Sequence, residues 1–179
     1  MTADVTVVVS HTGDLDEATR EACRGLLYDV FDDMTEPDWE HALGGLHAVA
    51  RAGTDVVGHA SLVQRRLLHG GRALRAGYVE AVAVRSDHRR RGIGGRLMSP
   101  LERVARRAYD VSALGATDEA VPFYLVRGWI LWEGPTSALT PVGVRRTPDD
   151  DGAVYVLPGA APLDVTGELT CDWRDGDVW

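Results

Sequence analysis

Apolar positions along this chain recur with two periods, one typical of strands and one typical of helices. Strand-like runs cover residues 5–10, 46–51, 56–66, 73–84 and 111–114, and shorter ones follow at 137–140, 154–157 and 169–173. Helical spacing covers a segment capped by Asp14 or Asp16 that runs to about Phe31, a short helix capped by Thr35, and residues 95–109 and 118–127. This order of elements predicts an α/β domain.

A basic, glycine-rich turn lies between the strand-like run 73–84 and the helical pattern after it. It reads Arg89-Arg90-Arg91-Gly92-Ile93-Gly94. Glycines let the backbone approach phosphate oxygens closely, and a helix start presents unpaired N–H groups to an anion. The turn lacks the Gly-Lys-Ser/Thr of a Walker loop and the dinucleotide pattern Gly-x-Gly-x-x-Gly. We therefore expect a pyrophosphate ligand other than a nucleoside triphosphate; a solvated basic turn is the alternative.

Length and composition indicate one globular domain over residues 1–179. Apolar residues make up 45% of the chain, and no apolar run approaches the ~20 residues of a membrane-spanning helix. The first residues lack the basic and then apolar segments of a secretory signal. Two cysteines do not make a disulfide framework, and metal-ligand spacing is missing. We expect a cytoplasmic enzyme without a bound metal.

Charge is distributed unevenly. The chain has 27 acidic and 19 basic residues, a net charge of −8, and every basic residue is arginine. Arginines gather between Arg72 and Arg107, whereas acids gather at residues 29–40, 149–151 and 168–177. A local basic patch on an acidic protein suits a small anionic cofactor. The acidic remainder argues against nucleic acid and is compatible with a cationic partner.

Two motifs carry a resemblance to a known family. The turn fits Arg-x-x-Gly-x-Gly, and about 30 residues later residues 123–129 fit aromatic-Tyr-x-x-x-Gly-aromatic around Tyr124. Both resemble elements of the GNAT N-acetyltransferase superfamily. In that family the loop holds the pyrophosphate of coenzyme A, and the tyrosine faces the acetyl-CoA sulfur. The alternative for Tyr124 is a packed core residue beside Phe123.

Further segments resemble the aminoglycoside 2'-N-acetyltransferases of actinobacteria along nearly the whole chain. They are residues 38–45, 77–80, 134–137, 146–152 and 171–179. The resemblance implies a GNAT acetyltransferase fold, with a mixed central sheet splayed in the middle and helices on both faces. It also implies acetyl-CoA as acetyl donor, an aminoglycoside acetylated at its 2'-amine, and a homodimer.

Acetyl transfer from a thioester to an amine sets four requirements. The donor must be held, and the resemblance assigns this role to Val82, Ala83, Val84, Arg89, Arg90, Arg91, Gly92, Ile93 and Gly94. The thioester oxygen needs a hydrogen-bond donor, for which we expect the Val82 backbone N–H. The departing thiolate needs a proton, from Tyr124.

The amine, finally, must be neutral. Glu80 is the candidate base, because it is a lone acid inside an apolar strand; we expect it to act through water. A half-buried strand also tolerates an outward glutamate, so a structural role stays open. Direct transfer in a ternary complex is expected, because neither Cys23 nor Cys171 has an evident histidine partner.

The substrate interpretation rests on carboxylates, because aminoglycosides are polycations. The resemblance assigns substrate contacts to Asp33, Asp38, Glu80, Ala81, Gly115, Asp149, Asp150, Asp177 and Trp179. It also places the terminal carboxylate of Trp179 in the active site, with a catalytic role on the amine, and we expect the indole to be buried. For any one aspartate the alternative is a cap or loop residue, and the run 149–151 is typical of a turn.

Two other functions stay open at this stage. One is acetylation of another polyamine or amino sugar on the same scaffold. The other is a non-catalytic protein that binds acetyl-CoA or an aminoglycoside. Glu80, Tyr124 and the basic loop are all present, which favours an enzyme.

Overall fold

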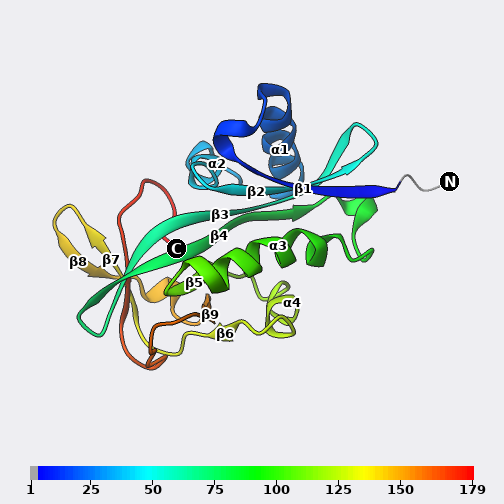
Figure 1. The fold of residues 1–179 in the computed structure, drawn as a ribbon. Helices are drawn as coiled ribbons and strands as arrows, with labels where there is room; N and C mark the ends of the chain where they lie inside the picture. Colours follow the sequence, from blue (N-terminus) through cyan, green and yellow to red (C-terminus); the bar gives the residue numbers. More distant parts are fainter. Residues whose placement is uncertain (1–3) are drawn as a thin grey trace. The chain divides into compact units, whose positions relative to one another are not determined.

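The computed structural model describes residues 4–179, so the first three residues of the N-terminal segment considered above lie outside it. The chain divides into two compact units. The first unit takes the residues up to 63 and residues 79–103, and the second takes 64–78 and 104–179. Strands β3 (Asp55–His69) and β4 (Arg72–Val84) and helix α3 (Ile93–Ala108) each contribute residues to both units (Figure 1).

The first unit is an antiparallel ladder with helices on both faces. β1 (Val5–His11) pairs with β2 (Leu46–Ala52), which pairs with the start of β3. Val49 faces the cluster formed by helices α1 (Glu17–Val30) and α2 (Glu36–His41). A side chain at Gly58, one position along from the partner of Val49, would instead meet Leu97 of α3. Because side chains alternate along a strand, α1 and α2 cover one face and α3 covers the other.

Local chemistry explains where α1 and α2 begin. Asp16 caps α1, since its carboxylate accepts a 2.7 Å hydrogen bond from the Thr19 N–H. Thr35 and Asp38 form a capping box at α2, with Pro37 in the first turn. The predicted caps at Asp16 and Thr35 are therefore confirmed, while Asp14 lies in a 3₁₀ turn before α1.

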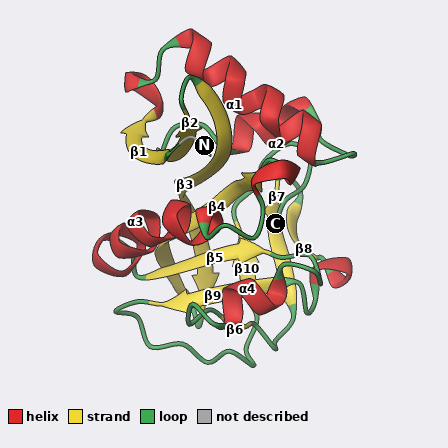
Figure 2. Cartoon of the chain, turned by 90° about the vertical axis from the view of Figure 1, so that its right-hand side faces the viewer, coloured by secondary structure: helices red, strands yellow, loops and turns green. Residues whose placement is uncertain are grey.

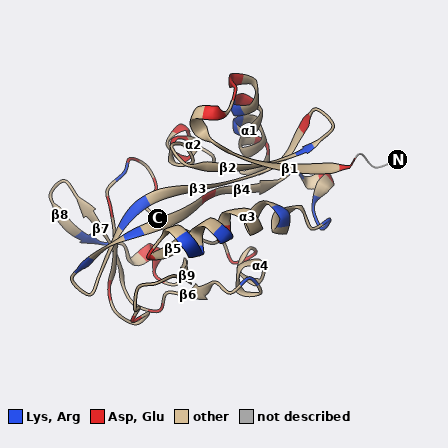
Figure 3. Ribbon diagram, in the orientation of Figure 1, with Lys and Arg blue, Asp and Glu red and all other residues tan. Residues whose placement is uncertain are grey.

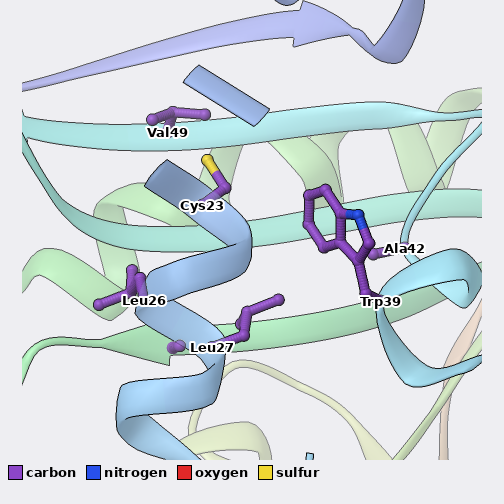
Figure 4. Close-up of a cluster of buried hydrophobic side chains, with 7 residues drawn as sticks. Cys23, Leu26, Leu27, Trp39, Ala42 and Val49 are labelled. Carbon is purple, nitrogen blue, oxygen red and sulfur yellow. The ribbon is translucent and has the colours of Figure 1, made fainter. Parts of the chain in front are cut away.

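A cluster of buried side chains joins both helices to the sheet (Figure 4). α1 contributes Cys23, Leu26 and Leu27, which are at most 5% exposed, and α2 contributes Trp39. Val49 of β2 and Ala83 of β4 face them from the sheet. This burial holds α1 and α2 against the same stretch of β4 that carries the candidate base.

The second unit combines parallel and antiparallel pairs. β5 (Val111–Gly115) runs parallel to the first half of β4 and antiparallel to β9 (Val154–Pro158), which also pairs with β6 (Ile130–Leu131) (Figure 2). β10 (Leu169–Cys171) pairs with the end of β3 and runs parallel to β7 (Thr136–Thr140). β7 forms a hairpin with β8 (Gly143–Arg146).

The strands follow the order β6-β9-β5-β4-β3-β10-β7-β8, with β2 and β1 added on β3, so the predicted mixed sheet is confirmed. The pairing of β4 with β5 covers Ala76–Tyr78 opposite Val111–Ala113 and then stops. β4 itself continues to Val84 and β5 to Gly115. The pairing of these two parallel strands therefore covers three residues of each.

The sequence-based boundaries fail in a few places. The helix predicted over 118–127 is shorter, because α4 spans Val121–Leu125 and residues 118–120 form a turn. Pro122 cannot donate a backbone hydrogen bond and disfavours helical geometry at the residue before it. α3 begins at Ile93, two residues before the predicted start. β6 and β8 were not predicted; β8 is exposed throughout, so it has no apolar alternation to reveal it.

Within the part of the chain that the structure describes, no helix has both the length and the apolar character needed to cross a membrane. Among the same residues, no group of three or more His, Cys, Asp or Glu side chains is placed to hold a metal ion.

Candidate active site

In the first unit, strand β4 departs from extended geometry at the residue after the candidate base. Ala81 has φ 53°, in the left-handed region that non-glycine residues rarely adopt. The two carbonyls on either side of this distortion accept hydrogen bonds from side chains of β3. Ser61 Oγ donates to the Glu80 carbonyl at 3.4 Å, and His59 Nδ1 donates to the Ala81 carbonyl at 2.8 Å. Glu80 itself is half-buried.

His59 belongs to a buried hydrogen-bonded chain that sequence reasoning did not find. His59 Nε2 lies 2.9 Å from His47 Nδ1, and His47 Nε2 lies 2.7 Å from Thr12 Oγ1. Both imidazoles are fully buried, and the ring of Trp39 packs against each. The sequence did hold a signal, because both histidines lie inside apolar strand-like runs, but their pairing depends on register.

Burial lowers the pKa of both histidines. The pKa of His47 falls to about 4, mainly through burial and then through repulsion from His59 and His11. The pKa of His59 also falls to about 4 through burial, against a smaller opposing effect of its bond to the Ala81 carbonyl. Both rings are therefore neutral at physiological pH.

The basic loop that precedes α3 has backbone geometry suited to an anion. Arg90 and Gly92 have φ 57° and 74°, and α3 begins directly afterwards at Ile93, whose side chain is buried. Left-handed residues before a helix turn successive N–H groups toward one point. A side chain at Gly92 would have open space but a strained φ. These residues fit the pyrophosphate of coenzyme A. Arginines also recur along α3 (Figure 3).

The loop has a support that sequence reasoning did not find. The Arg89 side chain is exposed, but its Nε donates to the Val84 carbonyl at the end of β4, at 3.1 Å. Arg85 donates to Asp87 at 2.8 Å, and the ring of His88 lies 2.7 Å from the same carboxylate. Arg85, and then His88, lower the pKa of Asp87 to about 2. This cluster anchors the chain between β4 and the loop.

In the second unit, Tyr124 lies on α4 and is 6% exposed. Its ring contacts the rings of Phe123 and Trp129, with centroids 5.2 and 6.1 Å apart. The helix ends in a Schellman motif at Gly128, which has φ 90°: the Trp129 N–H donates to the Tyr124 carbonyl and the Gly128 N–H to the Leu125 carbonyl. This turn explains the glycine four residues after the tyrosine. It fixes the helix that carries Tyr124.

The C-terminal segment folds back and buries its tryptophan, as predicted. Trp179 is 6% exposed, and its indole N–H donates to Thr147 Oγ1 at 2.9 Å. The backbone is held as well, since Arg174 donates to the Trp179 carbonyl at 3.2 Å and the Trp179 N–H donates to Asp177. Gly115 lies beside it: a Cβ there would come 3.7 Å from the Trp179 carbonyl carbon.

Two of the predicted substrate carboxylates lie near each other in the second unit. Burial raises the pKa of Asp150, and the negative charge of Asp177 raises it further, against the lowering effect of a hydrogen bond with Thr147. Thr147 also binds the Trp179 indole. The fold thus gathers Gly115, Asp150, Asp177 and Trp179, which are far apart in sequence.

The remaining predicted substrate aspartates have other surroundings. In the first unit, Asp38 Oδ2 accepts bonds from the N–H and hydroxyl of Thr35, at 2.8 and 2.6 Å, as a helix cap. Asp33 is exposed in the turn before α2. In the second unit, Asp149 is exposed in the 3₁₀ turn Pro148–Asp150. Asp151, directly after that turn, is paired with Arg146 at 2.6 Å.

Comparison with known proteins identifies the class. Residues 14–129 match the acetyltransferase (GNAT) family, and the chain belongs to this family. The predicted family and fold are therefore confirmed. Acetyltransferases of this family take acetyl-CoA as their acetyl donor.

One relative matches most of the chain. A protein of Mycolicibacterium fortuitum named aminoglycoside 2'-N-acetyltransferase is 53% identical over 174 residues, which cover 94% of this chain and 89% of that protein.

Solved structures support the fold at lower identity. An acyl-CoA N-acyltransferase from Pseudomonas aeruginosa aligns with a TM-score of 0.61 at 17% identity, covering 86% of this chain and 99% of that one. A GCN5-related N-acetyltransferase from Kribbella flavida aligns with a TM-score of 0.58 at 22% identity. It matches 75% of this chain, which spans 34% of the Kribbella protein.

The buried histidine pair predicts how stability depends on pH. The folded rings stay neutral down to about pH 4, whereas unfolded imidazoles take up protons below about pH 6.5. Unfolding is therefore favoured as pH falls, and stability present above pH 6.5 is lost between pH 6.5 and 4. Between pH 7 and pH 5 we expect a loss of about 2 kcal/mol for each histidine.

Urea denaturation at the two pH values measures this loss. The control is the double variant His47→Gln, His59→Gln, which has no imidazole to titrate at these positions and should lose less stability over the same interval. An equal loss in both proteins would show that these rings are not the cause.

Proposed function

We propose that this protein transfers the acetyl group of acetyl-CoA to the 2'-amino group of an aminoglycoside antibiotic, which inactivates the drug and confers resistance. The observation that carries this proposal is the 53% identity, along 94% of the chain, to a protein named for that activity. The proximity of Asp150 and Asp177 supports it. Two nearby carboxylates repel each other, and a bound polycation relieves that repulsion.

The acetyl donor is held along β4 and the loop after it. Backbone groups of Val82, Ala83 and Val84 bind the pantetheine arm. The loop from Arg89 to Gly94 and the N-terminus of α3 bind the pyrophosphate. Backbone N–H groups carry most of that binding, because left-handed Arg90 and Gly92 lead directly into the first turn of α3. Arg90 and Arg91 are exposed and add charge-assisted contacts.

The drug is held by acidic and main-chain groups. Asp150, Asp177 and Trp179 form the main contact, with Gly115 beside them. Gly115 suits this place because it adds no side chain next to the Trp179 carbonyl. Asp33, Asp38, Asp149, Glu80 and Ala81 contribute further contacts to the ammonium and hydroxyl groups.

The chemistry is a direct transfer. Glu80, through a water molecule, removes the proton of the 2'-ammonium, and Trp179 assists by contacting the amine. The neutral nitrogen then forms a bond to the thioester carbonyl carbon, and the Val82 N–H stabilises the negative charge that develops on the oxygen. The carbon–sulfur bond breaks, Tyr124 gives its proton to the departing thiolate, and the nitrogen loses its second proton to solvent.

Free coenzyme A, detected with a thiol reagent, tests the proposal. Acetyl-CoA is mixed with the protein and either a drug carrying a 2'-amine or a matched drug carrying a 2'-hydroxyl. Thiol release is expected with the amine alone, and NMR of the product should show an acetamide at the 2' position. Release with neither drug, or acetylation elsewhere on the ring, would contradict the proposal.

Tyr124→Phe separates catalysis from packing, because it removes only the hydroxyl. Loss of the general acid should lower kcat roughly ten- to a thousandfold while coenzyme A binding stays nearly normal. Steady-state kinetics and calorimetry measure the two effects. Unchanged turnover together with reduced stability would identify Tyr124 as a packing residue.

Gly92→Val tests the loop. A branched side chain at φ 74° is strained and displaces the N–H groups that face the anion. Binding of coenzyme A should be lost in calorimetry. Arg90→Ala should cost about 1–3 kcal/mol, the strength of one charge-assisted bond. Unchanged affinity in Gly92→Val would exclude the loop as the pyrophosphate site.

A further inference from the structure

The hydrogen bonds that link Thr12, His47, His59 and the Ala81 carbonyl all donate in one direction, toward β4. The Ala81 carbonyl can only accept, so His59 Nδ1 carries the proton of that bond. A neutral His59 then accepts at Nε2, which makes His47 Nδ1 the donor of the 2.9 Å bond between the rings. A neutral His47 then has its lone pair at Nε2, which accepts from the Thr12 hydroxyl at 2.7 Å; this is shorter than the 3.2 Å from that hydroxyl to its other acceptor, the Gly45 carbonyl. Every ring nitrogen is satisfied by this one arrangement of protons.

The outer end of the chain is also fixed. Thr12 Oγ1 accepts from the Gly44 N–H at 2.9 Å, and the Thr12 N–H donates to the Gly45 carbonyl at 2.9 Å. The Trp39 ring lies 6.4 and 6.1 Å from the two imidazole centroids and closes the cluster on one side. Ala81 packs against the apolar cluster under α1 and α2, to which Trp39 belongs. A buried group of side chains therefore holds one carbonyl of β4 in place.

The peptide group held by His59 joins Ala81 to Val82, and it includes the N–H that we propose for the thioester oxygen. A trans peptide is planar, so its C=O and N–H point in opposite directions and cannot turn independently. The peptide between Ala81 and Val82 is trans within the described chain. A bond that fixes the Ala81 carbonyl thus also fixes the Val82 N–H, the donor assigned to the thioester oxygen. The Ser61 bond to the Glu80 carbonyl holds the preceding peptide.

We infer that His59, held in its tautomer by His47, is a positioning residue that keeps the Val82 N–H aimed at the thioester oxygen. This inference rests on the proposed function. A proton relay is the competing role for two linked histidines, but the chain ends on a carbonyl oxygen, which cannot pass a proton onward. The positive φ of Ala81 explains why such a hydrogen bond is needed, because an alanine does not keep that conformation without outside contacts.

Two substitutions at one position test the inference. His59→Leu removes the donor. In His59→Asn the amide branches from Cγ where Nδ1 does, so it still reaches the Ala81 carbonyl while the link to His47 is lost. Val49→Ala is the control: Val49 is paired with His59 in the ladder and belongs to the buried cluster under α1 and α2, but its apolar side chain cannot form a hydrogen bond to β4.

In His59→Leu, kcat should fall about 10- to 100-fold, somewhat less than the loss on outright removal of an oxyanion donor. The Kd for coenzyme A should change less than about threefold, because the pyrophosphate loop is intact. His59→Asn should recover most of kcat, and Val49→Ala should keep it despite a lower melting temperature. Normal kcat in His59→Leu, or an equal fall in Val49→Ala, would overturn the inference.

An NMR measurement tests the same inference without an activity assay. The ¹⁵N shifts of the wild-type rings should show protons on Nδ1 of both His47 and His59, and the Val82 amide signal should shift in His59→Leu. Protons on Nε2 would overturn the inference. If the wild-type protein acetylated no aminoglycoside, the proposed function would fail while this measurement still reported whether His59 holds the peptide.

Discussion

The hydrogen bond from His59 to the Ala81 carbonyl is the interaction on which the arrangement of the first unit depends. Ala81 sits in a left-handed conformation that an alanine reaches only when its surroundings impose it. Here the surroundings are a pair of neutral imidazoles, the Trp39 ring and the cluster under α1 and α2. The packing of α1 and α2 and the left-handed conformation of Ala81 therefore depend on the same buried side chains.

The local distribution of charge in this protein differs from its overall negative charge. A chain of net charge −8 carries a run of arginines before α3, where left-handed Arg90 and Gly92 lead into the first N–H groups of the helix. In the second unit, partial burial and then the charge of Asp177 raise the pKa of Asp150. Perturbed pKa values cluster at functional sites, and a bound cationic ligand would offset the repulsion, which agrees with the proposed substrate.

Sequence reasoning succeeded where the information was local. The caps at Asp16 and Thr35, the strand before the loop and the helix after it all follow from a few neighbouring residues. It failed at α4, where Pro122 shortens the helix, and at β8, whose exposed residues show no alternation. Of the site, the loop and the buried Trp179 were predicted; the histidine chain was not, because its members come from three strands and a turn.

By itself, then, the amino-acid sequence determined the family and most of the order of elements, and it supplied the residues that we propose for acetyl transfer, because motifs and caps are written in short stretches of chain. The tertiary structure alone decided which of these residues meet. It used Asp38 as a helix cap, placed Asp150 near Asp177, and linked His47 to His59 through strand register. The physical reason is that hydrogen-bond partners and pKa values depend on distance in space, which a one-dimensional pattern does not contain.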